Sequence, residues 1–198
     1  MITIIDSGGA NIASIQFSLQ RFGVDAQLSR DVEIIKKSTH LILPGVGSAS
    51  YAMQYLQQYN LIETILSLTQ PVLGICLGMQ LLFDFSEEGQ TPCLGLIPGN
   101  IKKISPLNQT EKLIVPHMGW NKINIIKQNS ILKNIKANDY AYFVHNYIAP
   151  VNEYTLAQTI HGINFSAIVN LNNFYGVQFH PERSSDMGNQ LLQNFLEL

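Results

Sequence analysis

The segment "PVLGICLGMQLLF", residues 71–83, decides how the chain is organised. Its first half is a continuous apolar run of the kind that forms a buried parallel strand, and its second half reads as the start of a helix. Cys76 stands between two glycines at the point where the strand gives way to the helix. This order predicts an α/β fold, and it puts Cys76 at the carboxyl end of a strand, where open sheets collect reactive groups.

The rest of the first half repeats this alternation of strand and helix. Strand-like runs are expected at 2–6, 25–29 and 40–48, and helices at 11–23 and 49–68. Gly23 is a stop signal for the first helix, and the second is expected to break near Asn60. The pattern predicts an open, mainly parallel central sheet with helices on both faces, as in flavodoxin-like folds.

After residue 90 the pattern changes to short strand-like runs divided by turn residues. They lie at 99–104, 112–116, 120–126, 140–147, 155–160, 165–170 and 174–180. These runs predict a β-rich, partly antiparallel second half. A last helix is expected at 186–197, and no repeat or linker interrupts the chain, so we expect one domain over residues 1–198.

Composition narrows the class of protein. The chain has 198 residues, of which 46% are hydrophobic, which is enough for a real core. Its net charge of -2 provides no basic field for nucleic acid or for an anionic membrane, and no apolar run approaches a membrane span. Two cysteines without a signal peptide do not form a disulfide framework. We therefore expect a soluble protein of the cytoplasm.

The glycines around Cys76 indicate a nucleophile elbow. In the pattern G-x-C-x-G, a sharp turn crowds the backbone, so Gly74 and Gly78 must lack side chains. Such a turn exposes the sulfur at a helix N-terminus, whose partial positive charge favours the thiolate, and it aims the N–H of Leu77 at a developing oxyanion. The alternative is that Cys76 is a small core residue, since free cysteines are often buried.

A thiol nucleophile needs a base, and His180 is the best candidate. It ends an apolar strand in "GVQFHPERS" and precedes Pro181, which favours an extended backbone. In an extended segment residues i and i+2 face the same way, so Glu182 can orient the imidazole. A surface turn would also explain this motif, and an ordinary turn would explain the glycines of "PGVGS" (44–48), which can bring backbone amides to an anion.

Three motifs together resemble a known family. "LPGVGS", "GICLGMQLLF" and "FHPERS", in this order and spacing, resemble the class I (triad) glutamine amidotransferases over nearly the whole chain. Within that family, "IIDSGGANIASI", "VPHMGWN" and "YFVHNY" are most similar to the glutaminase subunits of imidazole glycerol phosphate synthases, which act in histidine biosynthesis.

The resemblance implies a glutaminase mechanism. Cys76 would attack the side-chain amide of L-glutamine, His180 would act as general base and acid, and Glu182 would orient it. The amides that would hold the oxyanion are those of Leu77, Val46 and Gly47. The residues that match glutamine-binding positions are Gly47, Gln80, Asn146 and Tyr147. No cofactor or metal is implied.

The resemblance also implies a partner. Ammonia would pass to a separate cyclase subunit of the (β/α)₈-barrel type, in a heterodimer that makes imidazole glycerol phosphate. The positions that would meet this cyclase or line the junction are Asn11, His117, Trp120, Tyr142, His145 and Arg183. Cys93 matches no catalytic position and is interpreted as a packing residue.

Some residues depart from the family pattern. The usual Asp-Tyr-Gly near the start is Asp6-Ser7-Gly8 here, followed by Gly9-Ala10-Asn11; Asn146 and Arg183 also replace commoner residues. These changes concern the partner interface more than the triad. Two alternatives stay open: a stand-alone thiol hydrolase acting on γ-glutamyl compounds or peptides, and a partner-binding module without activity.

Overall fold

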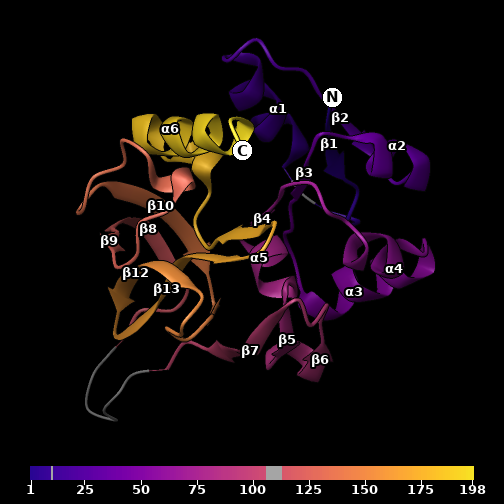
Figure 1. Ribbon diagram of the computed structural model, residues 1–198. Helices are drawn as coiled ribbons and strands as arrows, with labels where there is room; N and C mark the ends of the chain where they lie inside the picture. Colours follow the sequence, from indigo (N-terminus) through magenta and orange to yellow (C-terminus); the bar gives the residue numbers. More distant parts are fainter. Residues whose placement is uncertain (10, 106–112) are drawn as a thin grey trace.

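An eight-stranded sheet forms the centre of the computed structural model, which describes residues 1–9, 11–105 and 113–198 (Figure 1). From one edge to the other its strands are β2 (Ala26–Ser29), β1 (Ile2–Ile5), β3 (His40–Leu43), β4 (Val72–Ile75), β14 (Phe174–Val177), β13 (Ile163–Leu171), β12 (Thr155–His161) and β9 (Asn124–Ile125). The first five run parallel to one another, and each of the last three is antiparallel to the strand before it in this order. The predicted mainly parallel sheet with a partly antiparallel second half is confirmed.

Helices cover both faces of the parallel part (Figure 1). Helices α1 (Ile12–Gln20) and α6 (Ser185–Leu196) lie on one face, and α2 (Val32–Lys37), α3 (Ala49–Gln58), α4 (Leu61–Leu66) and α5 (Leu77–Leu81) lie on the other. Successive strand residues point to opposite faces. In β1, Ile4 therefore packs in the core beneath α1 and α6, whereas Ile5 packs in the core beneath α2 to α5.

Two smaller sheets flank the carboxyl edge of the central one. One pairs β8 (His117–Lys122) with β10 (Tyr140–His145), and the other has the order β11 (Tyr147–Ile148), β7 (Ile97–Lys103), β5 (Phe83–Ser86) and β6 (Thr91–Pro92). Three short 3₁₀ turns complete the elements: η1 (Glu88–Gln90), η2 (Ser130–Leu132) and η3 (Pro181–Arg183). The N–H of His180 donates to the carbonyl of Tyr142 at 3.0 Å, which ties β10 to the end of β14.

The structure corrects three details. The helix expected to begin after Cys76 is short: α5 ends at Leu81 and does not continue through the rest of the apolar segment, because the buried Phe83 pairs with Ile97 of β7. Residues 113–116 are not a strand, so that prediction was wrong; Lys112, like Ala10, lies outside the described residues. Helix α2, capped by Asp31, was not predicted. The break at Asn60 is confirmed, since this residue has a left-handed backbone with φ 54° between α3 and α4.

The longest helix in the three described ranges is α6, with 12 residues. Over those ranges, none of the helices has the length and apolar character that a membrane span requires.

Candidate active site

Three neighbouring strands end side by side at the carboxyl edge of the sheet. Strand β3 runs into the 44–48 turn, β4 runs into Cys76, and β14 runs into the segment that carries His180. Because β3, β4 and β14 are adjacent and parallel, their carboxyl ends share one edge. The topology therefore brings together the three motifs that are far apart in the sequence.

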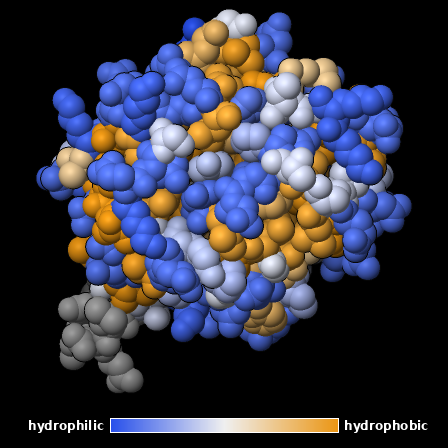
Figure 2. Space-filling view, viewed as in Figure 1, coloured by the Kyte–Doolittle hydropathy of each residue, from blue (hydrophilic) through white to orange (hydrophobic). Residues whose placement is uncertain are grey.

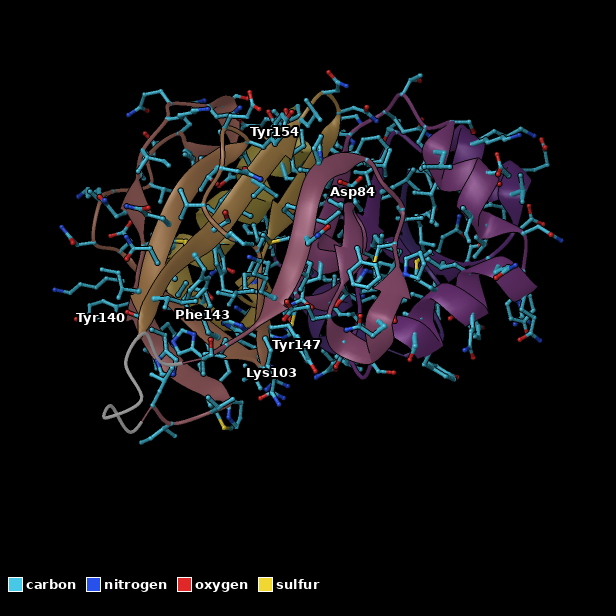
Figure 3. The ribbon with its side chains drawn as sticks, turned by 90° about the horizontal axis from the view of Figure 1, so that it is seen from below. Asp84, Lys103, Tyr140, Phe143, Tyr147 and Tyr154 are labelled. Atoms are coloured by element: carbon cyan, nitrogen blue, oxygen red, sulfur yellow. The ribbon has the colours of Figure 1, made fainter. Side chains whose placement is uncertain are left out.

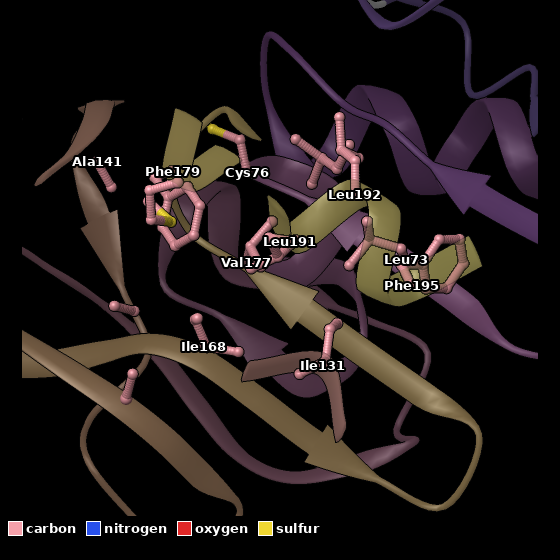
Figure 4. Packing of buried hydrophobic residues seen from close by; sticks show 14 of the residues in the cluster. Leu73, Cys76, Ile131, Ala141, Ile168, Val177, Phe179, Leu191, Leu192 and Phe195 are labelled. Atoms are coloured by element: carbon pink, nitrogen blue, oxygen red, sulfur yellow. The ribbon is translucent and has the colours of Figure 1, made fainter. Parts of the chain in front are cut away.

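Cys76 occupies a strained turn between β4 and α5. Its backbone has φ 54° and ψ −110°, a conformation that costs a residue with a side chain on the order of 1–3 kcal/mol. A Cβ added to Gly78 would overlap the carbonyl oxygen of Leu43, and one added to Gly74 would lie 2.7 Å from the Gly78 oxygen. The prediction that both glycines are required by close backbone approach is confirmed. The turn leaves Cys76 at the margin of the core, beside Phe179 (Figure 4).

His180 is paired with Glu182 in a largely buried setting. The imidazole Nδ1 lies 2.9 Å from Glu182 Oε1, and the side chain of Glu182 is only 2% exposed. Burial alone would lower the pKa of His180, but hydrogen bonding to Cys76 and to Glu182 outweighs it and raises this pKa to about 10. The imidazole is therefore protonated at neutral pH, paired with the carboxylate and sharing one pocket with the sulfur.

Serine hydroxyls hold the backbone of His180 and Glu182 in place. The backbone carbonyl of Glu182 accepts from the Ser18 hydroxyl at 3.5 Å, and the Ser184 hydroxyl donates to the His180 carbonyl at 2.7 Å. The second carboxylate oxygen of Glu182 is buried and has no hydrogen-bond partner among the described residues. The charge on His180 is thus the main compensation for this buried carboxylate.

A pocket of about 270 Å³ opens over the sulfur of Cys76. The candidate residues that line it are Val46, Gly47, Cys76, Leu77, Gln80, His145, Asn146, Tyr147 and His180, together with Glu88, Pro116 and Val144. Tyr147 reaches the pocket from β11, where it pairs with Lys103 of β7 (Figure 3). All four residues that were predicted to bind substrate therefore surround the nucleophile.

Two polar residues of the site were missed from the sequence. Glu88 lines it, and its Oε2 accepts from the N–H of Ala49 at 2.7 Å. Gln178 is fully buried, and its Nε2 donates to the sulfur of Cys76 at 3.8 Å. The i, i+2 rule that paired His180 with Glu182 could also have found Gln178, two residues before His180. No pattern of residue spacing in the sequence indicates that Glu88 lines the pocket.

The candidate oxyanion donors differ in their present hydrogen bonding. Leu77 is the first residue of α5, so its N–H has no partner inside the helix. The N–H of Val46 donates to the carbonyl of Gly9 at 3.2 Å, so this amide is already engaged. Gly47 has φ +93°, a conformation that favours glycine, and it lines the pocket.

This arrangement agrees with a known family. The family model for "Glutamine amidotransferase class-I" matches residues 3–198. The chain belongs to the class I glutamine amidotransferases.

Curated relatives of this amidotransferase are similar over their whole length. It is 50% identical to "Imidazole glycerol phosphate synthase subunit HisH" of Haemophilus influenzae over 196 residues, which covers 99% of this chain and 96% of the relative. The same name is carried by a protein of Mannheimia succiniciproducens that is 48% identical, with 98% of each chain covered. "Imidazole glycerol phosphate synthase subunit HisH 2" of Legionella pneumophila is 48% identical and covers 100% of this chain and 98% of the relative.

Solved structures of low sequence identity share the fold. A putative GMP synthase protein from Thermoplasma acidophilum superposes with a TM-score of 0.74 at 19% identity, covering 99% of this amidotransferase and 92% of that chain. PurLQS from Thermotoga maritima gives a TM-score of 0.70 at 17% identity, covering 99% and 97%.

The residues expected at a partner interface fall into two groups. Asn11, Trp120 and Arg183 are exposed, and Tyr142 is half-buried. His117 and His145 are buried, with 4% and 6% exposure, so their imidazoles do not form an outer surface. Burial, assisted by neighbouring histidines, lowers the pKa of His117 to about 4 and that of His145 to about 3. Both are therefore neutral at physiological pH.

Within the described ranges, Cys93 and the hollow beside it lack the groups that a catalytic site would need. Cys93 is half-buried, and burial raises the pKa of its thiol to about 12, which suits a packing residue. A hollow of about 650 Å³ beside Cys93 is larger than the catalytic pocket, but among the described residues no histidine or basic side chain lines it. Over the part of the chain that the structure describes, no group of three or more His, Cys, Asp or Glu residues could hold a metal ion.

Proposed function

We propose that this chain is the glutaminase subunit of imidazole glycerol phosphate synthase, which hydrolyses L-glutamine to glutamate and ammonia for histidine biosynthesis. Membership of the class I amidotransferases and the names of its relatives support this function. The observation that carries it is the strained turn that holds Cys76 in one pocket with His180, which is paired with Glu182.

In the proposed reaction the sulfur of Cys76 reacts as the thiolate while His180 is protonated. The sulfur attacks the side-chain amide carbon of glutamine, and a C–S bond forms. The imidazolium gives its proton to the amide nitrogen as the C–N bond breaks, which releases ammonia. Water then attacks the thioester while His180 takes its proton, and the C–S bond breaks to free glutamate. Glu182 keeps the ring oriented and stabilises its charge in each half-reaction.

The oxyanion of each tetrahedral intermediate needs backbone donors. We assign the N–H of Leu77 as one donor, because it has no partner inside α5 and lies beside the nucleophile. The 46–47 segment is the proposed source of the second. Because Val46 N–H donates to Gly9, its use as a donor requires that this 3.2 Å hydrogen bond first breaks.

The polar groups of the pocket match the ends of glutamine. Gln80 uses its nitrogen to bond the Tyr147 carbonyl and Gln178, so its oxygen is the group left to accept a hydrogen bond. Glu88 adds a carboxylate, which is suited to the α-ammonium of an amino acid. Gly47, Asn146 and Tyr147 complete the proposed substrate site.

The partner in this proposal is a cyclase of the (β/α)₈-barrel type, joined in a heterodimer. The exposed face of the β8–β10 sheet supports a docking surface near the catalytic pocket. Met118 and Trp120 are 67% and 53% exposed, and the rings of Trp120 and Tyr142 are in edge contact at 5.8 Å. Tyr142 and Val144 lie on the same side of β10, and Val144 lines the pocket. Ammonia released at Cys76 would thus emerge next to the docked partner.

Asn11 and Arg183 are the further interface residues of the proposal. Figure 2 shows that apolar residues reach the surface in separate patches between hydrophilic ones. The location in the cytoplasm stays a prediction from the sequence.

Replacement of the nucleophile tests the proposed function. In the complex with its cyclase, Cys76→Ala is expected to abolish glutamine-dependent synthesis but to leave synthesis from ammonium salts intact. Cys93→Ala is the matched control and is expected to retain both activities. Release of ammonia from glutamine by Cys76→Ala at the rate of the unmodified protein would exclude the mechanism.

A further inference from the structure

Two buried glutamines connect the wall of the pocket to the sulfur of Cys76. Gln80 Nε2 donates to the Tyr147 carbonyl at 2.9 Å and to Gln178 Oε1 at 2.9 Å, and Gln178 Nε2 lies 3.8 Å from Cys76 Sγ. The exposed fractions of Gln80 and Gln178 are 4% and 0%. Buried amides of this kind are costly unless they are hydrogen-bonded, so these contacts are integral to the fold.

The network fixes which way each amide points. The carbonyl of Tyr147 can only accept, so the nitrogen of Gln80 must face it. The second N–H of Gln80 then meets Gln178, which must present its oxygen. The nitrogen of Gln178 is therefore the end that faces Cys76, and it faces the sulfur as a donor. The histidine network secures the same carbonyl, since His145 Nδ1 also lies 2.9 Å from it.

Two groups of opposite character approach the sulfur apart from His180. The carbonyl oxygen of Val144 lies 3.7 Å from Cys76 Sγ and can only accept, so it favours the neutral thiol. The amide of Gln178 can donate, so it favours the thiolate.

We propose that Gln178 is a further catalytic residue of the glutaminase reaction, whose side-chain N–H stabilises the thiolate of Cys76 both at rest and as it leaves the thioester. The catalytic part of this inference rests on the proposed function. In acylation Gln178 raises the fraction of Cys76 that is ionised. In deacylation it stabilises the sulfur as the C–S bond breaks and negative charge returns to it.

The pH dependence of alkylation tests the proposal. Iodoacetamide reacts with the thiolate, so the rate at Cys76, followed by mass spectrometry of its peptide, rises with the ionised fraction. Gln178→Met keeps the side-chain length but removes the donor. It is expected to move the midpoint of the rate profile up by about one pH unit, and to lower kcat/KM for glutamine about 10-fold at neutral pH, with recovery at higher pH. Gln58→Met, at the exposed end of α3, is the control and is expected to change neither.

An unchanged alkylation midpoint in a folded Gln178→Met protein would overturn the proposal, because a packing role would lower stability without moving this midpoint. If that variant does not fold, the unmodified protein decides through NMR of its side-chain amides. The Gln178 amide protons are expected to shift as Cys76 ionises, and to stop responding in Cys76→Ala. Gln178 amide resonances that do not shift when Cys76 ionises would refute the contact.

The alkylation midpoint and the NMR shifts are measured without glutamine, so the two proposals can fail separately. If the alkylation midpoint of Gln178→Met equals that of an unmodified protein that hydrolyses glutamine, the role of Gln178 is rejected. If the midpoint shifts but the unmodified protein has no glutaminase activity, the proposed function is rejected.

Discussion

Replacing Glu182 by Gln tests the charge balance that holds His180 protonated. The change keeps the size of the side chain and removes its charge. A pKa of about 10 instead of 6.5 corresponds to on the order of 5 kcal/mol in favour of the imidazolium, supplied by Cys76 and Glu182 together against the cost of burial. If Glu182 provides about half of this energy, its loss lowers the pKa of His180 by roughly two units and moves the alkaline limb of kcat down by the same amount.

The assay is the initial rate of glutamate formation by the complex with its cyclase, measured from neutral pH upward. The mechanism needs a protonated His180, so the unmodified protein is expected to lose activity only as pH rises through the His180 pKa near 10. In Glu182→Gln that pKa falls, and the loss begins at a lower pH. Glu153→Gln changes an exposed carboxylate and serves as the control. The reasoning would be refuted if Glu182→Gln retained the alkaline limb of the unmodified protein.

Three further perturbations probe the frame around the site. A Cβ on Gly188 would overlap the Pro181 carbonyl, so Gly188→Ala is expected to lower the free energy of unfolding in urea by about 1–3 kcal/mol. It is also expected to slow catalysis by displacing the neighbours of Pro181, and unchanged stability and rate would contradict this. Relief of strain at φ 54° is expected to make Cys76→Gly more stable than Cys76→Ala by roughly 1 kcal/mol, and equal stability would argue against strain. The fold keeps His145 neutral, so the free energy of unfolding should fall as pH drops from 6.5 toward 3, by up to about 1.4 kcal/mol per pH unit. His180 has the opposite sign, and its contribution should be lost as pH rises from 6.5 toward 10; a flat profile on both sides would contradict the two shifts.

The sequence predicted the convergence at Cys76 because parallel strands impose it. Once three apolar runs are parallel neighbours, the residues that follow them must meet at one edge, and the crowding at Gly74 and Gly78 follows from the sharp turn. The contact of Glu182 with His180 was predicted, but its geometry was not: the prediction assumed one extended segment, whereas Glu182 lies in the 3₁₀ turn η3 that follows the extended His180.

Features that depend on packing between distant segments were beyond prediction. The early end of α5 depends on the pairing of Phe83 with β7, which no local pattern encodes. The linear motifs did not reveal that the buried His117 and His145 bond to each other at 2.9 Å across two strands; their place at the junction with the cyclase stays a prediction. The engagement of Val46 N–H by Gly9 likewise joins two turns that only the folded chain brings together.

Covalent labelling with the glutamine analogue diazo-oxo-norleucine tests the central assignment most directly. With the cyclase partner present, the label is expected on the Cys76 peptide alone, and added glutamine should protect it. Cys93 is an internal control, because its raised pKa keeps its thiol protonated. A label on Cys93, or none on Cys76 while glutamine is being hydrolysed, would contradict a mechanism built on Cys76 as the nucleophile.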